Sequence, residues 1–162
     1  MNIRSAIEKG FKILENSNIK SAKLDAEILM SKVFKQDRSY IVFNYDKMIN
    51  QTMFDEFIDL IYQRSNGKPI AYLIEKKDFW NSEFKVSEDV LIPRPDSEII
   101  IEQTLRLTKN KSQMNILDIG IGSGCLLLSI LKERKDFYGT GIDICKKSIN
   151  LCSFNSNKLG LT

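Results

Sequence analysis

Apolar residues recur every three or four positions through the first part of the chain, the spacing of a helix with one buried face. These stripes lie at residues 3–14, 24–33, 40–43 and 53–64. Ser21, Asp37 and Asn50 precede the later stripes and are predicted as N-caps. The fourth helix is expected to stop at Asn66-Gly67, and Pro69 could open one more turn. Because each stripe needs another to be buried, residues 1–75 are predicted to form a small helical bundle.

A different pattern follows at residues 76–95. Residues 77–80 and 83–86 are short aromatic or β-branched runs on either side of Asn81-Ser82, which predicts a β-hairpin that links two domains. Pro93-Arg94-Pro95 ends this linker, because proline disfavours helix in the residue before it. Asp96 or Ser97 is expected to cap a helix through residue 107.

A third pattern, of alternating strands and helices, occupies the rest of the chain. Its elements are a buried strand at 115–119, a glycine loop at 120–124, a helix at 126–131, a strand at 138–144 and a helix at 146–158. The order is typical of a nucleotide-binding α/β sheet. The predicted fold class is therefore α+β overall, with residues 96–162 as the start of a Rossmann-like domain. Two strand–helix units are too few to cover a sheet on both faces, so an unpaired strand edge is expected. The chain is then either part of a longer polypeptide or a truncated product whose second half is loosely folded.

Composition removes several classes of chemistry. The 162 residues contain no histidine, which excludes Ser-His-Asp and Cys-His catalysis, zinc sites with histidine ligands and a histidine pH switch. The net charge is +3, from 24 basic and 21 acidic side chains. Positive charges are spread along the chain rather than clustered, so direct nucleic-acid binding is not expected from this part.

Three cysteines stand at 125, 145 and 152, an odd number without a C-x-x-C pair. They are interpreted as small apolar residues in a reducing compartment, and no metal site is expected. The chain begins without the apolar run of a secretory signal, and its longest apolar stretch is too short to span a bilayer. A cytoplasmic protein without membrane association is predicted.

The glycine loop carries the strongest chemical signal. Glycines at 120, 122 and 124 allow a tight turn and a close approach of the backbone to a ligand. The following helix offers N–H groups and the positive end of its dipole. Asp143, at the end of the next strand, is placed to accept both ribose hydroxyls of an adenosine.

The loop spacing separates the possible ligands. A dinucleotide fingerprint, G-x-G-x-x-G, would put its third glycine at Cys125, whereas the chain has it at Gly124. G-x-G-x-G after the acidic strand residue Asp118 favours S-adenosyl-L-methionine (AdoMet). NAD or FAD binding and a purely structural loop remain open, and the absence of Gly-Lys-Ser/Thr excludes a P-loop.

Motifs over nearly the whole chain resemble one family in the same order. They are D-A-E-I-L at 25–29, R-S-N-G-K-P-I-A-Y at 64–72, V-L-I-P-R-P-D-S-E at 90–98, I-L-D-I-G-I-G-S-G at 116–124 and G-I-D at 141–143. The chain is similar to the peptide chain release factor glutamine N5-methyltransferases (HemK/PrmC). P-R-P-[ED]-[ST]-E before the glycine loop is specific to this family, because a generic methyltransferase has no reason to carry it.

The resemblance implies an activity and a site. The family transfers a methyl group from AdoMet to the glutamine side-chain amide of the Gly-Gly-Gln motif in class 1 release factors, and its helical domain helps to dock that substrate. Residues implied to line the AdoMet pocket are Gly120, Ile121, Gly122, Ser123 and Gly124, with Asp143 at the ribose. Arg94, Pro95 and Glu98 are implied near the mouth of the active site.

Two departures from the family pattern bear on function. Ile121 replaces the usual threonine, which removes a hydroxyl, and at most modestly weaker cofactor binding is expected. The Asn-Pro-Pro-Tyr motif that holds the target amide is absent from the 162 residues. No catalytic residue is therefore assigned within the chain, and residues 1–162 alone are predicted not to methylate.

Three other interpretations remain. One is a different amide or nucleic-acid methyltransferase, although the neutral charge of residues 1–92 argues against a nucleic-acid substrate. A neutral helical bundle followed by a partial cofactor domain could serve as a non-catalytic adaptor or an AdoMet-binding module. Some members of the family are fused to a second methyltransferase that acts on tRNA, so the chain could also be part of such a fusion.

Overall fold

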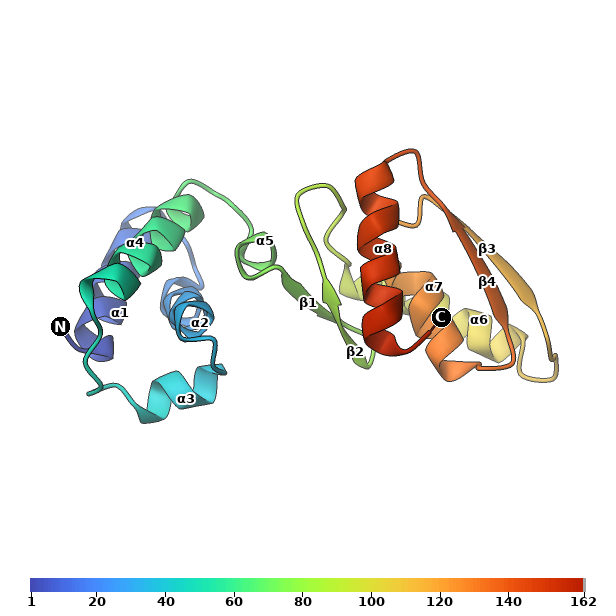
Figure 1. Ribbon diagram of the computed structural model, residues 1–162, viewed down its shortest axis with the longest axis horizontal. Helices are drawn as coiled ribbons and strands as arrows, with labels where there is room; N and C mark the ends of the chain where they lie inside the picture. Colours follow the sequence, from blue (N-terminus) through green and yellow to red (C-terminus); the bar gives the residue numbers. More distant parts are fainter. Residues whose placement is uncertain (162) are drawn as a thin grey trace. The chain divides into compact units, whose positions relative to one another are not determined.

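The chain folds into two compact units, Met1–Ile74 and the part that begins at Glu75. The computed structural model describes residues 1–161. A helical part comes first and short strands with helices follow (Figure 1), so the predicted α+β organisation is confirmed. Each unit has its own hydrophobic core and is described separately below.

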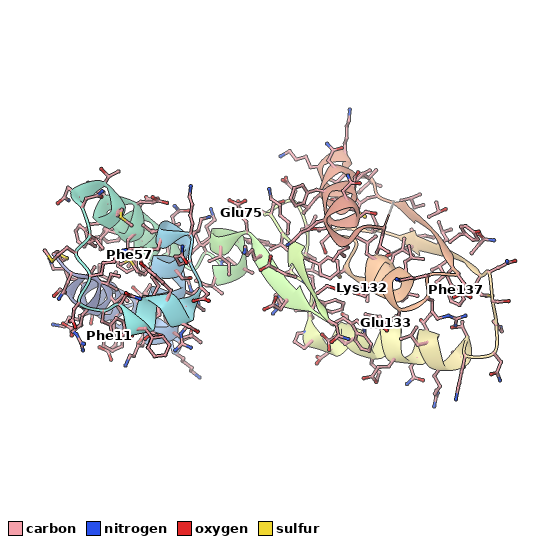
Figure 2. All side chains as sticks on the ribbon, turned by 60° about the horizontal axis from the view of Figure 1, so that its bottom comes forward. Phe11, Phe57, Glu75, Lys132, Glu133 and Phe137 are labelled. Atoms are coloured by element: carbon pink, nitrogen blue, oxygen red, sulfur yellow. The ribbon has the colours of Figure 1, made fainter. Side chains whose placement is uncertain are left out.

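The first unit is built from five helices among the described residues. They are α1 (Ile3–Asn16), α2 (Ala22–Phe34), α3 (Arg38–Phe43), α4 (Gln51–Ser65) and α5 (Ile70–Ile74). Phe57 of α4 is fully buried in the core, and Figure 2 shows it inside the helical unit. Gly10 lets α1 approach it closely, because a Cβ there would lie 2.7 Å from Phe57 Cζ.

Two of the three predicted N-caps are confirmed. The Asp37 carboxylate accepts a 2.6 Å hydrogen bond from Tyr40 N–H, and the Asn50 side chain accepts one of 2.9 Å from Met53 N–H. The prediction for Ser21 is wrong, because its side chain makes no capping bond to α2. Ser21 has ψ 19°, a turn conformation, whereas a capping hydroxyl usually needs extended backbone to reach the helix N–H groups.

Two buried carboxylates of α2 explain the D-A-E motif. Asp25 accepts a 2.7 Å bond from Arg64 Nε, and Arg64 also donates to the Lys68 carbonyl after α4. Glu27 accepts from Arg38 Nε and from the Tyr45 hydroxyl, each at 2.7 Å. Buried charges are tolerated when they are paired and hydrogen-bonded, so these motif residues hold the bundle together.

The second unit begins with an antiparallel hairpin of β1 (Lys76–Phe79) and β2 (Ser82–Lys85). The turn lies at Trp80-Asn81, one residue before the predicted Asn81-Ser82, because Phe79 pairs directly with Ser82. Trp80 takes φ 51°, and its backbone N–H donates to Glu98 at 2.7 Å. This tertiary bond holds a conformation that the local sequence does not favour.

Side chains of a helix fasten the hairpin turn. The helix is α7 (Cys125–Glu133). Lys132 donates to the Asn81 carbonyl at 3.0 Å and to the Ser82 hydroxyl at 2.8 Å, while Glu133 accepts from the Trp80 indole at 2.8 Å. Figure 2 shows Lys132 and Glu133 on neighbouring parts of α7 beside the hairpin.

The segment after the hairpin enters a helix differently from the prediction. A short 3-10 helix, η1 (Pro95–Ser97), leads directly into α6 (Glu98–Leu107). The expected cap at Asp96 or Ser97 is wrong: Asp96 lies inside the 3-10 turn, and Ser97 makes no side-chain capping bond. Its N–H instead bonds the Arg94 carbonyl at 3.0 Å, so backbone turns begin the helix.

The remaining strands form a two-stranded parallel sheet. β3 (Asn115–Ile119) pairs with β4 (Tyr138–Ile142), with α7 between them in sequence and α8 (Lys146–Leu159) after β4. Leu127 and Leu131 of α7 lie next to Gly139 of β4. Leu117, Ile119 and Ile142 on the other face of the sheet are exposed. The carboxyl ends of both strands lie at one edge of the sheet, which is where α/β proteins bind ligands.

Candidate functional site

The glycine loop connects β3 to α7 and is fixed to the end of β4. The N–H groups of Gly120 and Ile121 both donate to the Ile142 carbonyl, at 2.8 and 3.0 Å, and Gly124 N–H donates to the Ile121 carbonyl at 2.8 Å. The loop therefore turns tightly at the carboxyl end of the sheet. The structure brings together the loop and the strand end that the sequence singled out.

Gly120 and Gly124 both take a positive φ, but the surroundings of the two glycines differ. Gly120 has φ +83°, and a Cβ there would meet no atom within 4 Å. Gly124 has φ +81°, and a Cβ there would lie 2.6 Å from Cys152 Sγ. Open space therefore lies over Gly120, where a ligand can approach the backbone, whereas Gly124 permits close packing between the loop and α8.

Asp143 faces the glycine loop. Its Oδ2 accepts a 3.0 Å hydrogen bond from Gly122 N–H, and its Oδ1 accepts one of 2.8 Å from Cys145 N–H. These two backbone hydrogen bonds lower the pKa of Asp143, and the bond from Cys145 has the larger effect. The side chain is therefore ionised at neutral pH. A carboxylate offers about four acceptor positions, so it can still accept the hydroxyls of a ribose.

The pKa of Asp118, in β3, is shifted in the opposite direction from that of Asp143. Burial raises its pKa, and a hydrogen bond from the Leu127 backbone in the first turn of α7 opposes that rise. The carboxylate thus lies at the positive end of the α7 dipole, where it helps to position the helix that follows the loop.

Ile121 serves packing. Its side chain is buried against β4, and a Cβ at Gly141 would overlap Ile121 Cδ1. The replacement of the family's threonine therefore puts an apolar side chain into a space that the glycine leaves. Ser123, the other non-glycine residue of the loop, is also buried.

The residues predicted for the active-site mouth lie in η1 and directly beside it, with Arg94 before η1 and Glu98 at the start of α6. Arg94 and Pro95 are exposed, and Arg94 contributes its carbonyl to the turn before α6. Glu98 accepts the Trp80 N–H at the hairpin. Glu98 therefore has a structural partner that its motif did not indicate.

A groove of about 830 Å³ lies beside α7, β4 and α8. Its lining includes Ile121, Leu131, Phe137 and Cys152 and is largely apolar. Among the described residues that line it, Asp143 does not occur. The groove therefore reaches the glycine loop at Ile121, whereas the Asp143 carboxylate lies outside its lining.

Two of the three cysteines add little chemistry. Burial raises the pKa of the Cys125 and Cys152 thiols, which makes them poor nucleophiles at neutral pH. Residues 1–161 contain no group of three or more side chains suited to hold a metal ion. None of the helices in that range has the length and apolar composition to cross a membrane.

Sequence reasoning missed Asn155 of α8. Its side chain is completely buried and bonds both the glycine loop and the hairpin. A signal was available, because Asn155 continues the helical spacing of Ser148 and Cys152 and so lies on the inward face of α8.

The geometry of the loop and Asp143 suits AdoMet. Glycines that leave open space, a following helix N-terminus and an ionised carboxylate one strand away suit a nucleoside with a polar tail. Asp143 would hold the ribose, and the loop backbone would lie along the rest of the cofactor. The residues present fit this group.

The chain is similar to proteins of known name. Residues 5–74 match the PrmC N-terminal domain. The release factor glutamine methyltransferase of Buchnera aphidicola subsp. Baizongia pistaciae is 44% identical over 144 residues, which cover 87% of this chain and 51% of that protein. The Leptospira interrogans enzyme of the same name is 36% identical over 156 residues, with coverages of 96% and 54%.

A third relative gives the same result. The release factor glutamine methyltransferase of Clostridium acetobutylicum is 34% identical over 161 residues, 99% of this chain and 56% of the relative. The chain spans about half the length of the curated relatives it matches. The predicted resemblance is confirmed: residues 5–74 match the PrmC N-terminal domain, and over most of its length the chain is similar to the release factor glutamine methyltransferases.

Proposed function

We propose that this chain is the cofactor-binding and substrate-docking part of an AdoMet-dependent protein methyltransferase. Its substrate is the glutamine side-chain amide of the Gly-Gly-Gln motif in class 1 release factors. The observation that carries the proposal is Asp143, ionised and hydrogen-bonded to the glycine loop, in a chain similar to release factor glutamine methyltransferases.

The chain's own residues bind and orient the cofactor. Asp143 accepts the ribose hydroxyls, and its bond from Gly122 N–H keeps the carboxylate beside the loop. The open space over Gly120 lets the backbone approach the cofactor. When bound, AdoMet supplies an electrophilic methyl group on its sulfonium. The helical unit, Met1–Ile74, serves to dock the release factor.

The acceptor amide needs further residues. An amide nitrogen is a poor nucleophile because its lone pair is delocalised into the carbonyl. It reacts when acceptors hold its N–H groups and direct the nitrogen at the methyl carbon, and such positioning lowers a barrier by up to about 7–11 kcal/mol. The resemblance assigns this role to Asn-Pro-Pro-Tyr, which residues 1–162 do not contain. These residues alone are therefore proposed to bind AdoMet without methylating.

Calorimetric titration with AdoMet tests the cofactor site in the full-length protein. Asp143→Ala should weaken binding at least about tenfold, because it removes the bonds to both ribose hydroxyls. Asp136→Ala is the matched control, since Asp136 is ion-paired with Arg134 rather than bonded to the glycine loop. Absence of AdoMet binding by the unmodified protein would reject the cofactor site and favour the adaptor interpretation.

A methylation assay tests the other parts of the proposal. Full-length protein with AdoMet and a class 1 release factor should label the Gly-Gly-Gln glutamine, and replacement of that glutamine should abolish the label. Residues 1–162 alone should give no product. Turnover by those residues would show that the amide is held by groups within them.

A further inference from the structure

The Asn155 side chain joins three segments of the second unit. It lies on α8, and its amide is completely buried. Asn155 Oδ1 accepts Lys85 N–H at 2.8 Å, while Nδ2 donates to the Lys85 carbonyl at 3.0 Å and to the Ser123 carbonyl at 2.8 Å. Every polar atom of the amide therefore has a partner, as a buried amide requires.

The bonds to Lys85 lie on the open edge of the hairpin. Val86 N–H donates to the Glu75 carbonyl, so residues 75 and 86 form a hydrogen-bonded pair. Such pairs alternate along an antiparallel ladder, and the backbone groups of Lys85 consequently point away from β1. Asn155 bonds both the N–H and the carbonyl of Lys85, as a neighbouring strand would.

The bond to Ser123 acts on the glycine loop. Ser123 lies between Gly122 and Gly124, and glycine backbones have more conformational freedom than other residues. A fixed amide on the Ser123 carbonyl limits this freedom from the side of α8. The same helix follows directly after Asp143 and Cys145, whose N–H bonds the Asp143 carboxylate.

We propose that Asn155 is a positioning residue that holds the glycine loop and Asp143 in the arrangement that binds AdoMet. The inference rests on the proposed function for the identity of the ligand. Asn155 acts through the Ser123 carbonyl and through the placement of α8. The hairpin is part of the arrangement, because the Lys85 bonds fix the position of the amide.

Asn155→Asp in the full-length protein is the first test. The change keeps the size of the side chain and one acceptor, but an ionised carboxylate cannot donate to the Ser123 and Lys85 carbonyls. The dissociation constant for AdoMet, measured by calorimetry, should be about tenfold larger. Without cofactor, hydrogen exchange at residues 120–124 should be faster than in the unmodified protein.

The pH profile distinguishes positioning from general damage. Protonation of the substituted carboxyl restores one donor, so AdoMet binding by N155D should recover as the pH is lowered. Asn155→Ser provides a smaller, uncharged substitution if N155D does not fold. It should also weaken binding and speed loop exchange, without the acid recovery.

Ser148→Ala is the matched control on the same helix. Ser148 is buried, its hydroxyl donates to the Asp89 carbonyl at 3.3 Å and its side chain also bonds the Cys145 thiol, so the control removes buried bonds of α8 that do not reach the Ser123 carbonyl. Unchanged affinity and loop exchange in the Asn155 variants would overturn the inference, as would equal weakening in S148A. If the unmodified protein does not bind AdoMet, the proposed function fails and this inference fails with it. Normal AdoMet binding by both Asn155 variants would overturn the inference alone.

Discussion

Gly120 and Gly124 share a positive φ but have different surroundings. The space over Gly120 is open, whereas Gly124 is pressed against Cys152 and Leu128. The first glycine therefore leaves room for a ligand, and the second permits the packing of α7 and α8 beside the loop. Two residues of one motif thus have separate physical tasks.

Substitution by alanine should separate these tasks. Gly120→Ala should reduce the free energy of unfolding by about 1–2 kcal/mol, the cost of a side chain at positive φ, and weaken AdoMet binding. Gly124→Ala should cost roughly 1–3 kcal/mol more, because its Cβ also overpacks the Cys152 contact. Urea unfolding and calorimetry provide the two measurements. Equal losses of stability would contradict the difference in their surroundings.

The Asp143 carboxylate predicts an acid-dependent contribution to stability. Its pKa in the folded protein is lowered, so its backbone bonds stabilise the fold fully above the ordinary value of 3.8, and that contribution is lost as the pH falls through the lowered pKa. The stability difference between the unmodified protein and Asp143→Asn should therefore be largest near neutral pH and narrow toward about pH 3. Urea unfolding across this range measures it, and a constant difference would refute the predicted linkage.

Individual site residues were predictable to different degrees. Glycine and aspartate at their positions reflect local demands, a tight turn and an anionic acceptor, and a linear pattern records such demands. Asn155 instead bonds the backbone of Ser123 and Lys85, which lie 32 and 70 residues away in the chain. No local pattern contains those distances.

At the scale of elements, paired charges link α2 to α4. Asp25 is 3% exposed, and Arg64 reaches both its carboxylate and the Lys68 carbonyl. The pair therefore sets the end of α4 against α2 and fixes the loop that leads to α5. This gives the R-x-x-G and D-A-E motifs one shared structural reason.

Removal of one partner should destabilise the helical unit strongly. Arg64→Met leaves the Asp25 charge buried without its guanidinium, and we expect a loss of about 3–5 kcal/mol in the free energy of unfolding. Asp25→Asn with Arg64→Met should lose less than the two single changes added together, because no isolated charge remains. Urea unfolding of the four proteins gives the coupling, and additive losses would show that the two side chains do not interact.

Element boundaries show where local patterns stop being sufficient. Asp37 and Asn50 cap as predicted, because extended backbone at each position lets the side chain reach the next N–H groups. The hairpin turn lies one residue before its predicted position because side chains from other elements bind it. Glu98 accepts Trp80 N–H, Lys132 donates to the Asn81 carbonyl, and Glu133 accepts the Trp80 indole N–H. Turn propensities depend only on the residues of the turn itself, so they do not predict a register that distant side chains hold in place.

At the scale of the whole molecule, the chain consists of two units with separate cores. The PrmC N-terminal domain match, residues 5–74, coincides closely with the first unit. Its buried residues and ion pairs lie within Met1–Ile74, so the unit contains the contacts that stabilise it.

Residues 1–74 should therefore fold on their own. Expressed separately, they should show a helical circular dichroism spectrum and a single cooperative urea transition. Phe57→Ala should lower the midpoint, since loss of a buried phenylalanine costs about 3–5 kcal/mol. A separate unit that stays unfolded, or that unfolds without cooperativity, would show that it depends on the residues after Ile74.

The amino-acid sequence by itself determined the helical stripes, the strand–loop–helix order, the glycine spacing, Asp143 and the family resemblance, because these depend on residues close together in the chain. Only the tertiary structure decided the partners of the buried groups: Arg64 with Asp25, Ile121 with Gly141, and Asn155 with Ser123 and Lys85. The physical reason is that burial makes a polar or bulky group depend on whichever neighbour the fold brings to it, and a linear pattern does not contain that neighbour's distance.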